Sequence, residues 1–111
     1  MSDSDIDLMN RIKAKGVDLM ILFDEINTRI QAKGNELWAE EQNLMTLLRA
    51  AEQGSDPEAL DRAHAAMRDL QQRIGAFQRA EAPRWAAIGR SDIQQGIMAL
   101  VRAVAQPDSL I

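Results

Sequence analysis

Three cations in the early part of predicted helices are the residues best suited to binding an anion. Lys13 and Lys15 precede Gly16 early in the first predicted helix, and Arg84 lies at the start of the last one. At Arg84, the first backbone N–H groups of the last helix have no partner within it and also favour an anion. A charge-assisted hydrogen bond contributes about 1.5–3 kcal/mol. One chain would therefore bind a phosphate weakly, whereas a symmetric assembly repeating these residues would bind it more tightly.

The other residues capable of chemistry form no familiar constellation. His64 is the one histidine and cysteine is absent, so neither a zinc-type site nor a Ser-His-Asp triad can be assembled. Glu36, Glu40 and Glu41 are spaced as ligands of a divalent cation, but no matching ligand set occurs on the other segments. A solvated helix face is therefore expected for these acids. The sequence predicts no metal site, no cofactor and no catalytic activity.

Charge is distributed unevenly over the 111 residues, whose formal net charge is −4. Residues 1–61 hold 6 cations and 13 acids, whereas residues 62–111 hold 7 arginines and 4 acids. The two parts can attract one another within a helical bundle, or the arginines can serve an anion. A chain that is acidic overall and has few aromatic residues is not expected to bind DNA or RNA polymers. No segment has the length of a membrane span, and the acidic start is no secretory signal, so a cytoplasmic protein is expected.

The apolar spacing predicts helices throughout. The first is expected from about residue 4 to 52, with apolar positions at Ile6, Met9, Ile12, Met20, Phe23, Ile26, Ile30, Leu37, Leu44 and Leu47. Gly16 and Gly34 within it would be kinks, close-packing points or breaks. Gly54 is a natural end, either Ser55 or Asp56 can cap the next helix, and Pro57 suits its first turn.

The second predicted helix has apolar residues three and four apart, which form a seam suited to an antiparallel hairpin with the first helix. These residues are Leu60, Ala63, Met67, Leu70, Ile74 and Phe77. The helix is expected to end within residues 79–83. Pro83 would open a third helix that runs to about Ala105 and carries Trp85, Ile88, Ile93, Ile97, Leu100 and Val104. The expected fold is all-α, a long helical hairpin plus a C-terminal helix.

Small residues recur seven apart in the third predicted helix, at Ala82, Gly89, Gly96 and Ala103. Each glycine inside a helix costs about 1 kcal/mol relative to alanine, so a compensating contact is expected. Small residues on one face allow another backbone to approach closely. The pattern predicts assembly into a symmetric homo-oligomer. The apolar end of the tail Asp108-Ser109-Leu110-Ile111 is expected to dock on a neighbour.

Two blocks of sequence resemble a known family. They are residues 5–16, DIDLMNRIKAKG, and residues 84–107, RWAAIGRSDIQQGIMALVRAVAQP. Together they are similar to the small helical phage proteins that act as anti-CBASS cyclic-nucleotide sponges, the second such family. The resemblance lies at the two ends of the chain and not in its middle. It divides a single domain, residues 1–111, into core blocks 4–26 and 80–107 and an extended antiparallel hairpin over 27–79.

The resemblance implies a non-catalytic homohexamer in the infected bacterial cell, which sequesters cyclic di- or trinucleotides and so starves CBASS effectors. The family's dinucleotide lysine matches Lys13, Lys15 stands where a small hydroxylated residue contributes, and the trinucleotide arginine matches Arg84. The family's base-stacking tyrosine has no counterpart, because the chain has no tyrosine. Trinucleotides are therefore expected before dinucleotides. The alternative is a coiled-coil adaptor that uses the same hairpin to bind another protein.

Overall fold

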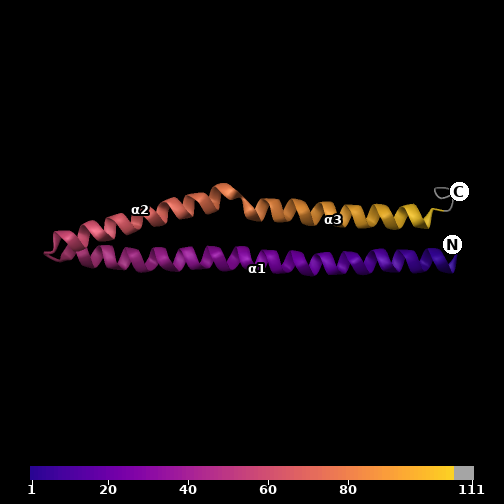
Figure 1. The fold of residues 1–111 in the computed structure, drawn as a ribbon, viewed down its shortest axis with the longest axis horizontal. Helices are drawn as coiled ribbons and strands as arrows, with labels where there is room; N and C mark the ends of the chain where they lie inside the picture. The colour runs from indigo at the N-terminus through magenta and orange to yellow at the C-terminus, as the bar shows by residue number, and fades with distance from the viewer. Residues whose placement is uncertain (107–111) are drawn as a thin grey trace. The chain divides into compact units, whose positions relative to one another are not determined.

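A computed structural model describes residues 1–106 and shows three helices in that range (Figure 1). They are α1 (Asp3–Gln53), α2 (Pro57–Ala80) and α3 (Ala82–Ala105). The described residues contain no strand, so the predicted all-α class is confirmed for them. The expected docking of the tail, Asp108 to Ile111, lies outside the described residues.

The chain consists of two compact units, and α1 contributes to both. Unit 1 combines Met1–Thr28 with the segment from Pro83 onward, so it pairs the first part of α1 with α3. Unit 2 is Arg29–Ala82, in which the rest of α1 folds back on α2. Gly16 and Gly34 interrupt neither part of α1, which is one continuous helix of 51 residues.

Unit 2 is held together by the predicted seam. Leu37 and Leu70 are buried, Leu70 completely, and Ile74 and Phe77 of α2 lie half-buried beside Leu37. Complete burial of a leucine side chain contributes about 1.5–3 kcal/mol. The prediction for Leu47 is wrong, because this side chain is 60% exposed. The seam of α1 passes through its neighbours Leu44 and Leu48 and leaves Leu47 on the flank.

Unit 1 has a thinner core. Its inward positions on α1 include Met9, Ile12, Gly16 and Met20, and among them only Gly16 is buried. Val104 of α3 is the buried large apolar residue of this unit's described part. Ile6 and Ile26 are exposed, contrary to prediction, because the seam passes through the adjacent polar residues Asp5 and Asn27. Trp85, Ile88 and Leu100 of α3 are exposed as well.

The helix ends follow local chemistry. Asp56 caps α2, because its Oδ1 accepts a hydrogen bond of 3.0 Å from the backbone N–H of Glu58, and Pro57 follows as predicted. Gly54 donates its N–H to the carbonyl of Ala50 without a left-handed backbone conformation. Glu81 does take that conformation, with φ of 52°, and its N–H donates a hydrogen bond to the carbonyl oxygen of Gln78. Glu81 therefore ends α2, and α3 starts immediately afterwards.

The glycine that permits close packing within the chain is Gly16 of α1. A Cβ built there would lie 3.1 Å from Cγ1 of Ile97, so α3 approaches α1 closely at this point. Cβ atoms built on Gly89 and Gly96 would meet nothing within 4 Å. These two glycines are therefore not explained by contacts within the described part of the chain, and their predicted role in assembly stays a prediction.

Candidate functional site

Lys13 lies at the rim of an open hollow in unit 1, between α1 and α3. The hollow has a volume of about 740 Å³ and is lined mainly by apolar side chains, including Val17, Ile21 and Met98. Asp24 and Gln94 are its other polar groups. An apolar floor with a few polar groups at its edge is the usual composition of a small-molecule site. Lys13 can contribute a mobile positive charge there.

Lys15 belongs to a different hollow of unit 1, of about 580 Å³. Ile12, Ile97 and Leu100 form its apolar part, and Arg11 lies at its edge with Lys15. Asp7 accepts a hydrogen bond of 3.0 Å from Nε of Arg11. Ile97 lines both hollows, so the two lysines flank it rather than converge on one ligand position.

Arg84 stands in the first turn of α3 with its guanidinium beside an exposed indole. Its Cζ lies 5.9 Å from the ring centroid of Trp85, and that tryptophan is 62% exposed. A second contact of this type places Cζ of Arg90 at 5.2 Å from the ring of Phe23, across the helix pair of unit 1. Of these two arginines, only Arg84 adjoins an aromatic surface that is open to solvent.

One chain does not bring the three predicted residues together. Arg84 precedes Ile97 by thirteen residues on α3, which is about 20 Å along the helix axis, and Ile97 is the residue that lies beside Gly16. Lys13 and Lys15 are therefore remote from Arg84 within unit 1. A common ligand site would need residues from more than one chain.

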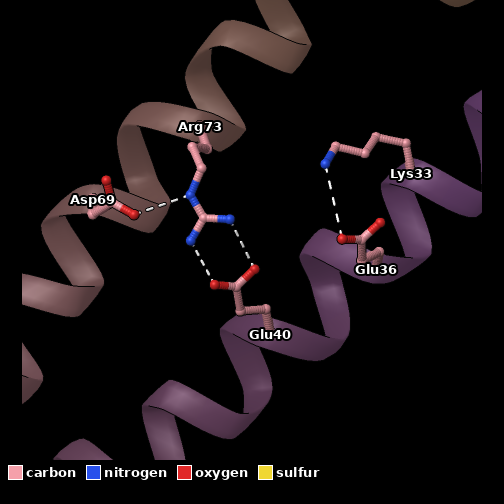
Figure 2. Close-up of polar contacts among 5 residues, drawn as sticks. All are labelled: Lys33, Glu36, Glu40, Asp69 and Arg73. Carbon is pink, nitrogen blue, oxygen red and sulfur yellow. Dashed lines mark hydrogen bonds and ion pairs between the residues drawn. The ribbon is translucent and has the colours of Figure 1, made fainter.

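Each acid of the α1 trio has a partner side chain in unit 2, and Figure 2 shows the partners of Glu36 and Glu40. Nη1 of Arg73 donates to Oε2 of Glu40 at 2.9 Å, and Nη2 donates to the other oxygen. Glu36 lies 3.9 Å from Nζ of Lys33, and Glu41 accepts a bond of 3.4 Å from Gln71. The predicted solvated acidic face is thus partly an ion-pair surface.

The Arg73 guanidinium changes the titration of this site. Its hydrogen bonds to Glu40 hold the pKa of that carboxyl below its ordinary value. In turn, the hydrogen bond to Glu40, supported by Asp69, raises the pKa of Arg73 above its ordinary value. Nε of Arg73 donates to Asp69 at 3.0 Å, so one guanidinium joins carboxylates of both helices.

Neither metal ligation nor membrane insertion is indicated by the described residues. Residues 1–106 contain no group of three or more His, Asp or Glu side chains that could hold a metal ion, and His64 is exposed. Within the same range, no helix is both long enough and apolar enough to cross a membrane.

Two polar residues that line the hollows of unit 1 are not among the site residues predicted from sequence. Gln94 lines the hollow of Lys13, and Arg11 lines that of Lys15. The four-residue spacing of Arg11 and Lys15 could have indicated a shared helix face. Nothing in the sequence signals Gln94, because its position depends on how α3 aligns with α1.

Much apolar surface remains exposed. Large apolar side chains that are more than half exposed include Val17, Ile21, Trp38, Leu47 and Trp85. Among residues 1–106, the buried large apolar side chains are Leu37, Leu70 and Val104. A domain normally buries a continuous core, so such a surface is typical of a chain that packs against others.

The fold and these surfaces define a small all-helical protein with cations beside open hollows. The chain is 37% identical over 108 residues to the curated Anti-CBASS protein 2 of Pseudomonas phage JBD67, and the match covers 97% of this chain and 86% of that protein. It belongs to that protein's family, as the terminal blocks predicted. The similarity also passes through the middle, which corrects the expectation that it is confined to the ends. No family model and no solved structure matches the chain.

Proposed function

We propose that this protein helps a phage to evade CBASS defence by sequestering cyclic oligonucleotide messengers without chemical turnover. The observation that carries the proposal is its end-to-end similarity to a protein named Anti-CBASS protein 2. Cyclic trinucleotides are the preferred ligands in this proposal, and cyclic dinucleotides the secondary ones. The family resemblance and the cations of unit 1 support this ligand class.

The site is proposed to form between chains of a symmetric assembly, for which the family resemblance implies six copies. Separate chains would supply Lys13, Lys15 and Arg84, because one chain holds Arg84 away from both lysines. Repetition of a guanidinium around a symmetry axis matches the repeated phosphates of a cyclic oligonucleotide. The exposed apolar surface supports assembly, since it leaves ample area for contacts between chains.

Trp85 is proposed to stack on a base of the ligand. Its indole is 62% exposed and lies beside the guanidinium of Arg84, so one segment offers both a stacking surface and a phosphate ligand. Stacking of a base on an aromatic side chain contributes about 1–3 kcal/mol. This tryptophan would supply the aromatic surface for which the chain has no tyrosine.

Titration calorimetry with a panel of cyclic tri- and dinucleotides tests the proposal. Arg84→Ala should weaken binding by roughly 10- to 150-fold, the equivalent of about 1.5–3 kcal/mol. Lys13→Ala and Lys15→Ala show which hollow serves which ligand. Arg68→Ala, an exposed arginine of unit 2, is the matched control and should bind like the parent. Sedimentation of each variant must show an unchanged mass.

Two outcomes would contradict the proposal. No binding across the panel would favour the adaptor, for which the exposed apolar surface would serve a protein partner. Mass spectrometry of the ligand released by denaturation tests turnover: recovery of the intact nucleotide is expected, and a linearised product would indicate a hydrolase.

A further inference from the structure

Unit 2 carries a regular row of charges along one face of α2. The row, called here the α2 stripe, consists of Glu58, Arg62, Ala66, Asp69 and Arg73. Spacings of four, four, three and four residues place these side chains on one side of the helix. The four charged members are 43–87% exposed, and their signs alternate about the central alanine. Within the chain Arg62 pairs with Glu58, and Arg73 pairs with Asp69 and with Glu40 of α1, so a second copy would share these charges rather than meet free ones. The stripe therefore presents a charge pattern to solvent at a flank of the hairpin.

An open apolar groove of about 550 Å³ runs beside the stripe at the tip of the hairpin. Leu47 of α1 forms one side, and Ala59, Ala63 and Ala66 of α2 form the other. Leu47 is 60% exposed although it adjoins the seam. Alanines on a helix flank allow another helix to approach to about 8 Å between axes. The groove thus has the composition of a helix-packing surface.

The stripe is complementary to itself in one orientation only. When α2 of a second copy lies antiparallel with Ala66 at the crossing, Arg62 faces Asp69 of the second copy. In the same arrangement Glu58 faces Arg73 of the second copy. A two-fold contact repeats each pairing, so four oppositely charged pairs form. A parallel arrangement would instead place like charges opposite one another, which is unfavourable.

We infer that the α2 stripe and its groove form a two-fold contact with a second copy of this chain. Leu47 and the alanines would provide the apolar packing. Exposed ion pairs contribute little individually, so the charges mainly select the antiparallel orientation. This inference goes beyond the proposed function, because it involves unit 2 alone and needs no nucleotide.

Charge reversal in the full-length protein tests the pairing. Arg62→Glu or Asp69→Arg alone places like charges opposite each other twice, and each should weaken the contact at least tenfold in sedimentation equilibrium. The double variant Arg62→Glu/Asp69→Arg restores opposite charges and should return to within about threefold of the parent protein. Arg68→Glu, the same charge change outside the stripe, is the control and should assemble normally.

A cysteine provides a second test that does not depend on charge. The chain has no cysteine, so Ala66→Cys introduces a single thiol at the proposed two-fold axis, where it meets its own copy. Mild oxidation should convert most of this variant to a disulfide-linked dimer, whereas Arg68→Cys should stay largely unlinked.

The inference is overturned if both single reversals keep the parent's mass in sedimentation. It is also overturned if the double variant fails to regain the parent's assembly although its thermal unfolding matches that of the single variants. Equal cross-linking of Ala66→Cys and Arg68→Cys would also overturn it. Nucleotide titration of Arg62→Glu separates the α2 stripe contact from the proposed function. Sedimentation reads loss of the contact between copies, and calorimetry independently reads whether the nucleotide binds.

Discussion

The two units use similar helix pairs for different purposes. Unit 2 closes over a regular leucine seam and ties its helices with the Glu40–Arg73 ion pair. Unit 1 brings its helices into close contact where Gly16 meets Ile97, leaves more large apolar side chains exposed, and carries Lys13, Lys15 and Arg84. The comparison indicates that unit 2 is held by contacts within the chain, whereas unit 1 leaves more of its large apolar side chains exposed to solvent.

The largest expected effect that tests this difference in burial between the two units is that of Leu70→Ala. Leu70 is completely buried in unit 2, so its truncation should cost about 2–5 kcal/mol of unfolding free energy. Leu100→Ala in unit 1 is the matched control, and because Leu100 is 55% exposed it should cost much less. Denaturant unfolding at one chain concentration measures both. Equal losses would show that unit 1 depends on its exposed leucine as strongly as unit 2 on its core.

A glycine in each unit sharpens the packing difference. Gly16→Val should destabilise the protein by about 1–3 kcal/mol, because a Cβ there lies only 3.1 Å from Ile97. Gly34→Ala in unit 2 places a Cβ at an ordinary 3.7 Å from Phe77 and should stabilise by up to about 1 kcal/mol through helix propensity. Thermal unfolding measures whether each variant raises or lowers the melting temperature. Changes of the same sign in both variants would contradict the difference in packing between the two glycines.

The turn of unit 2 offers a smaller effect. Asp56→Ala removes the oxygen that accepts the N–H of Glu58 and should cost about 1 kcal/mol. Asp56→Asn retains a capping oxygen and is the control. Denaturant midpoints compare the two variants, and an equal loss in both would mean that charge rather than capping matters at this position.

The smallest expected effect is the pH dependence of Glu40. Its lowered pKa means that its contribution to stability is complete above the ordinary value of 4.5 and is lost as the pH falls through the lowered value. Melting temperatures of the parent and Glu40→Gln should therefore differ near neutral pH and converge in acid. Glu36→Gln, which alters a longer contact to Lys33, should change melting less. A pH-independent difference would exclude the ion pair as its cause.

Local chemistry made much of the fold predictable from sequence. The Asp56 cap, Pro57 and the spacing of Leu70 with its neighbours specify where α2 begins and which face it buries. The terminal blocks likewise indicate the family to which the similarity over 97% of the chain assigns it. The misassigned residues Ile6, Ile26 and Leu47 each lie beside the true seam, because a three-to-four spacing tolerates a shift of one position.

What the sequence determined by itself is the set of helices, their ends and the cations they carry, since these depend on neighbours along the chain. Only the tertiary structure decided that Gly16 is the close-packing glycine and that Lys13 and Lys15 border separate hollows. It also decided that Arg73 joins Glu40 to Asp69. These contacts depend on how one helix is aligned along another, and that alignment results from packing of residues distant in sequence.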